Sequence, residues 1–236
     1  MRLLALAAIA LLASPMTVHA ATTTRASVAS DGTQGNSSSS TTRQQALSAD
    51  GRFVAFVSCA SNLVPNDTNG QCEVFVRDRL TGTTQRMSVA SDGTQGNAYS
   101  DIPAISADGR YVAFFSPATN LVAGDTNGHA DVFVRDRETG TTQRVSVATG
   151  GTQGHNQSYP SGISADGWYV AFYSLASNLV AGDTNGRVDA FVHDRQTGTT
   201  ERVSVASDGT QGNGDSYCQQ GDSGHARRVD QLRPRQ

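Results

Sequence analysis

The residues best suited to do chemistry in this chain lie in an acidic loop that occurs three times. In the second copy Asp125, Asn127 and Asp131 are spaced around a glycine, which places three oxygen-bearing side chains on one turn. Oxygen ligands around a glycine turn are typical of calcium loops. The candidate metal ligands are Asp67, Asn69 and Glu73 in the first copy, Asp125, Asn127 and Asp131 in the second, and Asp183, Asn185 and Asp189 in the third.

The sequence offers no comparable set of catalytic residues. Residues 221–224 read Gly-Asp-Ser-Gly, which resembles the nucleophile phrase of trypsin-like proteases. A serine nucleophile also needs a histidine base and an orienting carboxylate, and no matching histidine phrase lies upstream. The histidines at 129, 155, 193 and 225 lack the spacing of zinc ligands. We therefore predict no catalytic residues and no cofactor other than calcium.

Each acidic loop belongs to a repeating unit of 58 residues. The phrase Ser-Ala-Asp-Gly begins at Ser48, Ser106 and Ser164, and the phrase Thr-Gly-Thr-Thr begins at Thr81, Thr139 and Thr197. An Arg-x-Ser-Val-Ala phrase begins at Arg25, Arg86, Arg144 and Arg202, with a first interval of 61 residues. Internal repetition of this kind indicates one supersecondary unit per repeat.

Each unit is predicted to contain four β-strands. In the second copy we expect strands at 104–106, 110–116, 131–136 and 143–148, separated by an Asp-Gly turn, the acidic loop and a Thr-Gly turn. A link rich in Gly and Asn, residues 149–159, then leads to the next unit. Four-stranded repeats of about 40 to 50 residues are typical of β-propeller blades, and the long acidic loop accounts for the extra length.

The expected fold is therefore all-β, with three full four-stranded blades. The predicted segments are a signal peptide at 1–20, an orphan outer strand and linker at 21–45, blades at 46–103, 104–161 and 162–213, and a disordered tail at 214–236. The orphan strand is the Arg25–Ser30 phrase. Closed propellers have about 4 to 8 blades, so three blades predict an incomplete ring. Free blade edges in such an arc predict self-association.

The repeat also resembles a known family. Residues 105–114, Ile-Ser-Ala-Asp-Gly-Arg-Tyr-Val-Ala-Phe, followed by Asp-Val-Phe-Val-Arg-Asp at 131–136 and Thr139-Gly140, are similar to the WD40-like repeat of TolB-type β-propellers. The resemblance covers about Ala46 to Ala206 and implies an exported propeller of a family used mostly for binding. Some members form the non-catalytic propeller of prolyl-oligopeptidase-like peptidases. A truncated propeller part of a secreted hydrolase is therefore the alternative.

Two interpretations of the acidic loops stay open. The loops resemble the calcium loops of integrin-type propellers, but Pro65, Ala123 and Ala181 stand where that pattern begins with Asp. Calcium takes about six to eight oxygens, so carbonyl groups and water would have to supply about half of them. The other interpretation is a metal-free turn, in which Asp and Asn bond the backbone and Gly takes a positive φ.

The N-terminus indicates the compartment of the protein, and the composition indicates which partners to exclude. Arg2, the apolar run Leu3–Ala13 and the small residues Val18 and Ala20 form the pattern of a cleavable signal peptide. We therefore expect a secreted or periplasmic protein with Ala21 as its first mature residue. The net charge of −3 argues against a nucleic-acid partner, and no later segment has the length to insert into a membrane.

The cysteines suggest one local disulfide. Cys59 and Cys72 flank the acidic loop of the first copy, where the other copies carry apolar residues. An oxidising compartment permits this pairing, and two small buried thiols are the alternative. Cys218 would then be unpaired. Taken with the repeat, these features predict a non-enzymatic binding or scaffold protein whose partner is a protein, peptide or glycan of the cell envelope or exterior.

Overall fold

The computed structural model describes residues 23–41 and 45–217. These residues form twelve strands in three four-stranded antiparallel sheets, with no helix among them. The strands of the first sheet are β1 Ser39–Ser40, β2 Phe53–Ser58, β3 Glu73–Asp78 and β4 Thr83–Arg86. Those of the second are β5 Asp101–Ile105, β6 Tyr111–Ser116, β7 Asp131–Asp136 and β8 Thr141–Arg144. Those of the third are β9 Ser158–Ile163, β10 Tyr169–Ser174, β11 Asp189–Asp194 and β12 Thr199–Arg202.

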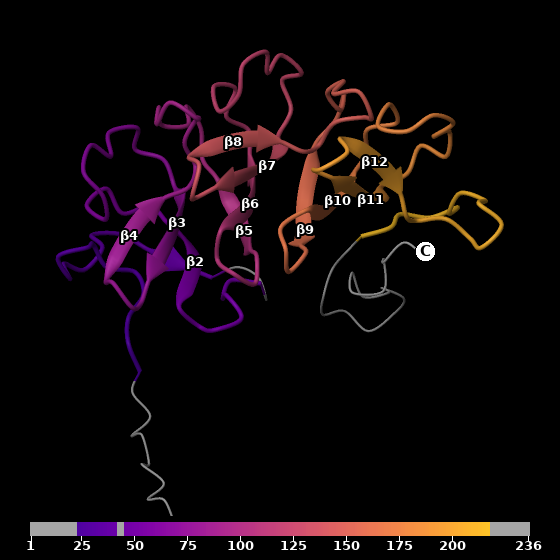
Figure 1. Cartoon of the computed structure of the whole chain (residues 1–236). Helices are drawn as coiled ribbons and strands as arrows, with labels where there is room; N and C mark the ends of the chain where they lie inside the picture. The colour runs from indigo at the N-terminus through magenta and orange to yellow at the C-terminus, as the bar shows by residue number, and fades with distance from the viewer. Residues whose placement is uncertain (1–22, 42–44, 218–236) are drawn as a thin grey trace, which may run out of the picture.

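The three sheets stand side by side in an arc, each adding one blade to it (Figure 1). Consecutive strands are neighbours within every sheet, as in a propeller blade. The outer strands β4, β8 and β12 lie toward the convex side, and β5 and β9 lie toward the concave side (Figure 1). The prediction of three propeller-type blades in an incomplete ring is confirmed.

The Ser-Ala-Asp-Gly phrase forms the turn between the first two strands of a blade. Ser106 Oγ donates to the Asp108 carboxylate at 2.5 Å and accepts from the Tyr111 backbone N–H at 2.9 Å. Gly109 follows with φ +75°, a conformation that a side chain disfavours. This local chemistry explains why the phrase recurs in every repeat.

The core lies between blades, because alternate residues of each strand face opposite neighbours. Small apolar side chains on one face of a blade meet a pair of phenylalanines on the next blade. Between blades 2 and 3, for example, Ala113, Val132 and Val134 pack with Phe172 and Phe191, and all five are at most 1% exposed. Blades 1 and 2 meet in the same way around Phe114 and Phe133. On the other face of blade 1, Phe56 and Phe75 are buried against residues of their own blade, such as Leu63.

Some predicted strand limits were wrong. The first strand of blade 2 begins at Asp101 rather than 104, with a bulge between Asp101 and Ala104. Ser39–Ser40 already pairs with β2, and β9 begins at Ser158, so blades 1 and 3 start before the predicted residues 46 and 162. The fourth strand is Thr141–Arg144 rather than 143–148, because the chain turns into the link after Arg144. Long-range pairing, which the sequence pattern does not contain, decides these limits.

The predicted orphan strand at Arg25–Ser30 is also wrong. Its structure holds only an isolated bridge between Val28 and Gln34, and Gly32 closes a turn onto Ala29. The same turn forms in every link, as the bridges Val89–Gln95, Val147–Gln153 and Val205–Gln211 show. The phrase therefore marks a link between blades and not an outer strand.

Cys59 and Cys72 form a disulfide that closes the acidic loop of blade 1. This confirms the pairing suggested by their joint appearance in one copy. Cys218, the predicted signal peptide and residues 218–236 of the predicted tail lie outside the described residues. Within the described ranges, no helix is long and apolar enough to cross a membrane.

Candidate functional site

Each acidic loop closes around an arginine of its own blade. In blade 2, Arg144 at the end of β8 places Nη1 2.9 Å from Asp125 Oδ1 and 3.3 Å from Asp131 Oδ2. The side chains of Asp125 and Asp131 are 2% and 0% exposed, and that of Arg144 is 8% exposed. The positive charge between the two buried carboxylates is therefore supplied by the chain itself.

The other two copies repeat this arrangement with small differences. In blade 3, Arg202 Nη1 lies 3.1 Å from Asp183 Oδ1 and 3.5 Å from Asp189 Oδ2. In blade 1, Arg86 Nη1 lies 3.5 Å from Asp67 Oδ1 but 2.9 Å from Glu73 Oε2. The longer side chain of Glu73 reaches the arginine more closely than an aspartate does. In blade 2, Ser146 Oγ also donates to Asp131 Oδ1 at 2.5 Å, and among the described residues Glu73 of blade 1 accepts no such bond from a serine.

The asparagine of the loop makes a turn and does not point its oxygen at a shared ligand. Asn127 Oδ1 accepts the backbone N–H of His129 at 3.0 Å, which is the Asx-turn geometry. Its Nδ2 donates to Asp131 at 2.9 Å and to the Gly154 carbonyl at 3.0 Å. Asn69 and Asn185 bond in the same way in the other copies.

A glutamine of the following link fastens the loop from the other side. Gln153 Oε1 accepts from Arg144 Nη1 at 3.0 Å and from the backbone N–H of Thr126 at 3.1 Å. Its Nε2 donates to the Gly124 carbonyl at 2.8 Å. The acidic loop and the link of a blade are thus held together on one face, which we call the loop face.

Burial raises the pKa of one acidic side chain in each of these loops. Desolvation raises the pKa of Asp125, partly offset by Arg144 and reinforced by Asp131. Burial likewise raises the pKa of Asp183 and of Glu73. Two carboxylates share one arginine in each loop, so the pairing leaves one carboxylate without a full counter-charge.

The nine predicted metal ligands are therefore brought together in three groups of three, but their arrangement does not fit calcium. A calcium ion would need both carboxylates at about 2.3–2.6 Å, and the guanidinium nitrogen already lies between them. The asparagine oxygen is directed to the backbone instead. Among the described residues, no group of three or more His, Cys, Asp or Glu side chains is placed to hold a metal ion. The geometry is that of the metal-free turn.

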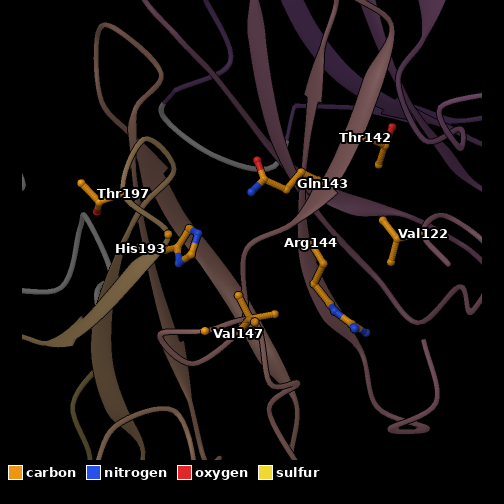
Figure 2. Close-up of a pocket in the computed structure, with 10 residues that line it drawn as sticks. Val122, Thr142, Gln143, Arg144, Val147, His193 and Thr197 are labelled. Carbon is orange, nitrogen blue, oxygen red and sulfur yellow. The ribbon is translucent and has the colours of Figure 1, made fainter. Parts of the chain in front are cut away.

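A groove of about 500 Å³ opens between blades 2 and 3 next to His193 (Figure 2). In blades 1 and 2 the same position holds Arg77 and Arg135, which fill the space and bond the carbonyls of Ala29 and Ala90 at 3.0 Å. His193 is shorter, and its Nδ1 lies 2.9 Å from Thr200 Oγ1. Within the described residues, its buried Nε2 has no hydrogen-bond partner. Burial lowers the pKa of His193 to about 4.

A second feature of the loop face is a ladder of aromatic rings, which the sequence reasoning missed. Phe115 and Tyr159 stack across the boundary of blades 2 and 3 with ring centroids 4.8 Å apart, and Tyr159 stacks on Tyr173 at 5.1 Å. Tyr173 meets Tyr217 edge-on at 5.4 Å, and Tyr99 lies 5.9 Å from Phe115 at the other end. The ladder consists of Tyr99, Phe115, Tyr159, Tyr173 and Tyr217.

The ladder lies beside the links and the acidic loops of blades 2 and 3. Phe115, Tyr159 and Tyr173 lie at the end of β6, the start of β9 and the end of β10. Tyr99 and Tyr217 lie in the segments that follow β4 and β12. Tyr99 and Tyr217 are 45% and 51% exposed at its two ends. A signal existed in the sequence, because Phe115 and Tyr173 occupy one repeat position and Tyr159 and Tyr217 another.

No protein-family model matches this chain, and no curated protein matches it. Among solved structures, it is similar to TolB from Acinetobacter baumannii, with 19% identity, a TM-score of 0.44 and coverage of 74% of this chain and 34% of that one. It is also similar to a putative TolB from Agrobacterium tumefaciens, with 18% identity, a TM-score of 0.41 and coverage of 66% and 46%.

A third similar structure is the β-propeller domain of the Trilobed protease from Pyrococcus furiosus, with 12% identity and a TM-score of 0.41. The match covers 64% of this chain and 39% of that one. The chain thus spans between about a third and a half of the length of these structures. The similarity is one of fold, to TolB and other β-propellers.

Proposed function

We propose that this chain is a non-enzymatic binding or scaffold protein of the periplasm or the cell exterior. The observation that carries this proposal is the aromatic ladder on the loop face. Tyrosine offers a large apolar ring at small entropic cost and a hydroxyl that bonds a partner, so it is enriched at binding surfaces. Isolated exposed aromatics are ordinary on protein surfaces, but five rings in continuous contact are not explained by blade packing alone.

The ladder suits a protein, peptide or glycan rather than a small buried ligand. It runs across the boundary of blades 2 and 3, and its ends Tyr99 and Tyr217 are exposed. Polar groups accompany it, because Tyr159 Oη donates to Gln157 Oε1 at 2.5 Å. The mild net charge of −3 gives no reason to expect a polyanion. Export rests on the signal-peptide pattern of residues 1–20.

The test is binding to peptide and oligosaccharide arrays by the full chain and two variants. The ladder variant carries Tyr159→Ser and Tyr217→Ser, and the control carries Leu80→Ser, which changes a residue that is 76% exposed in a turn between β3 and β4. We expect the ladder variant to bind at least about tenfold more weakly and the control to bind as the parent does. Equal binding by both variants, with both folded, would argue against the ladder as the binding surface.

The acidic loops lead to a second proposal, which concerns calcium. Because an arginine already lies between the two carboxylates of each acidic loop, we propose that the loops fasten the blade and that calcium adds no stability to the folded chain. The alternative assignment to the propeller part of a secreted hydrolase stays a prediction. A neighbouring reading frame that encodes a catalytic domain would favour that alternative.

A further inference from the structure

The N-terminal segment and the last link have almost the same sequence. Residues 25–36 read Arg-Ala-Ser-Val-Ala-Ser-Asp-Gly-Thr-Gln-Gly-Asn, and residues 202–213 differ from them only in having Val203 in place of Ala26. Both segments fold into the same turn, with the bridges Val28–Gln34 and Val205–Gln211. We call residues 25–36 the N-terminal clasp and residues 202–213 the C-terminal clasp.

The N-terminal clasp is bound to blade 1. Thr84 Oγ1 donates to the Val28 carbonyl at 2.6 Å, and the Thr84 backbone N–H donates to Ser30 Oγ at 3.0 Å. Arg77 Nη1 donates to the Ala29 carbonyl at 3.0 Å.

At the far end of the clasp, Asn36 and Asn62 are joined. The Asn36 backbone N–H donates to Asn62 Oδ1 at 2.9 Å, and Asn62 Nδ2 donates to the Gln34 carbonyl at 2.9 Å. Gly35 lies so close to the blade that a Cβ there would be 3.1 Å from Ala60 Cβ and 3.4 Å from Leu63 Cδ2.

The same contacts join each link to the blade that follows it. Thr142 Oγ1 donates to the Val89 carbonyl at 2.6 Å, as Thr84 does to Val28. Asn120 Nδ2 donates to the Gln95 carbonyl at 2.8 Å, as Asn62 does to Gln34. The N-terminal clasp is therefore a link that blade 1 holds in the place where a preceding blade would present one.

In the part of the chain that the structure describes, no blade binds the C-terminal clasp in this way. Within the described residues, no hydrogen bond of this kind reaches the Val205 and Gln211 carbonyls, Ser207 Oγ or Asn213. The exposure of the segment agrees, because Val205 is 40% exposed while Val89 and Val147, its counterparts, are 6% and 9% exposed. Val192 and Val203 of blade 3 are likewise half-buried, whereas Val134 and Val145 are at most 1% exposed.

The opposite face of the blades carries a second set of complementary groups. Arg137 of blade 2 stacks on Phe53 of blade 1, 4.3 Å from the ring centroid, and Arg195 of blade 3 stacks on Tyr111 of blade 2 at 4.4 Å. By repeat position, Tyr169 of blade 3 is the next ring and Arg79 of blade 1 is the matching arginine. In the described residues, neither has a cation–π partner.

Backbone groups of the Ser-Ala-Asp-Gly turns show the same pattern. Ala49 N–H donates to the Ala107 carbonyl at 2.8 Å, and Ala107 N–H donates to the Ala165 carbonyl at 3.0 Å. If this series of bonds continued from blade to blade, the Ala165 N–H would donate to a following blade and the Ala49 carbonyl would accept from a preceding one. Within the described residues, neither group is bonded in this way.

We propose that blade 3 of one copy docks onto blade 1 of a second copy, where its C-terminal clasp takes the place of the N-terminal clasp. The ligand of the clasp site on blade 1 is thus the segment Ser-Val-Ala-Ser-Asp-Gly-Thr-Gln-Gly-Asn. Three blades from each of two copies make six, which falls within the about 4 to 8 blades of closed propellers. Two identical head-to-tail contacts then close a ring, as heterologous interfaces do when the rotation permits.

The N-terminal clasp acts as a competitor in this exchange. It is tethered to blade 1 and therefore acts at an effective concentration of about millimolar. Both clasps offer the same acceptor groups to blade 1, so the one present at the higher effective concentration occupies it. At micromolar protein concentration this is the N-terminal clasp, and the parent chain should remain mostly monomeric. Weakening the N-terminal clasp alone should favour the dimer.

The test uses two glycines at the same position of the two clasps. Gly35→Leu should displace the N-terminal clasp, because even a Cβ there crowds Ala60 and Leu63. Gly212→Leu is the matched control, since a Cβ at Gly212 would find no atom closer than the Ser204 carbonyl oxygen at 3.6 Å. The change therefore leaves the monomer intact but blocks docking on blade 1. Mass is measured in solution by light scattering, and folding by circular dichroism.

We expect the parent and Gly35→Leu/Gly212→Leu to be monomeric and Gly35→Leu to shift by at least tenfold toward the dimer. A synthetic peptide with the sequence of residues 202–213 should return Gly35→Leu to the monomer, and the same peptide with Leu at the position of Gly212 should not. A folded Gly35→Leu chain that stays monomeric would overturn the proposal. A dimer that persists in the double variant, or in the presence of the peptide, would do so as well.

Discussion

At the scale of the residue, the repeat shows what a single side chain can change. His193 stands where blades 1 and 2 carry Arg77 and Arg135, and the groove of Figure 2 opens beside it. The arginines fill the blade boundary and bond the link before them. The histidine does neither and keeps a buried, unbonded Nε2 among the described residues. Blade 3 is therefore fastened to its link less tightly than the other two blades.

The buried histidine makes stability depend on pH. Its pKa in the folded chain is lowered to about 4 by burial, while an unfolded histidine titrates near about 6.5. Between these values the unfolded chain binds the proton and the folded chain does not. The contribution of His193 is therefore fully present above about pH 6.5 and is lost as the pH falls toward about 4.

We expect urea unfolding to show a loss of about 1–2 kcal/mol between pH 7 and pH 5 from this group. His193→Arg should remove that loss and add the missing bond to the link. His155→Asn, a change at an exposed position to the residue of the first link, serves as the control for loss of a histidine. The account of His193 fails if His193→Arg loses as much stability on acidification as the parent does.

At the scale of the element, the acidic loop is a closed unit within each blade. The loop sits between the second and third strands, its arginine comes from the end of the fourth, and its glutamine comes from the link. These segments are brought together by the sheet, so the unit requires the folded blade. An internal cation of this kind stabilises two buried carboxylates without an external ion.

Replacing the internal cation should therefore be costly. Arg144→Ala leaves Asp125 and Asp131 buried and facing each other, and we expect a loss of about 3–5 kcal/mol in the free energy of unfolding. Arg187→Ala, at an exposed position in the third acidic loop, should change stability by less than about 0.5 kcal/mol.

Calcium separates the two interpretations of the loop. Millimolar calcium should leave the melting temperature of the parent unchanged, because the arginine occupies the place between the carboxylates. An ion that binds only the folded chain would raise it. A clear rise in the parent, measured by calorimetry, would restore the calcium interpretation.

At the scale of the whole molecule, stability comes from the boundaries between blades. Each blade presents small side chains on one face and phenylalanines on the other, and the two kinds pack together where blades meet. The glycines of the Ser-Ala-Asp-Gly turns also belong to these boundaries. A Cβ at Gly167 would lie 2.0 Å from the ring of Tyr111 in the preceding blade. A repeat protein of this kind is stabilised largely by nearest-neighbour interfaces.

Two equivalent glycines separate the effect of the boundary from that of the backbone. Gly167 and Gly51 both have positive φ, +76° and +72°, but a Cβ at Gly51 would meet only Arg79 Nη1, at 3.7 Å. We expect Gly51→Ala to cost about 1 kcal/mol from backbone strain. Gly167→Ala should cost about 2–4 kcal/mol, because the ring of Tyr111 must also move. Chemical denaturation measures both, and equal costs would show that the ring contact contributes nothing.

Much of the fold could be predicted from the sequence because it is local. The 58-residue step, the Ser-Ala-Asp-Gly turn and the alternation of Asp131–Asp136 depend on residues close together in the chain. They determined the blade, the number of blades and the position of β7, which the structure has at the predicted limits. The disulfide was suggested by the same means, since Cys59 and Cys72 interrupt an otherwise regular repeat.

What only the tertiary structure decided depends on contacts between distant residues. The sequence places Arg144 in a strand and Asp125 in a loop, but only the folded sheet brings the two within 2.9 Å and favours a turn over a calcium site. The aromatic ladder joins Phe115 to Tyr159 across a blade boundary. Residues 25–30 resemble the end of a fourth strand in sequence, yet they bind blade 1 as a link. The sequence does not show this, because the bond between Thr84 and Val28 joins residues that come together only on folding. A repeat pattern encodes each blade, whereas the partners of a side chain at a boundary are set by how neighbouring blades pack.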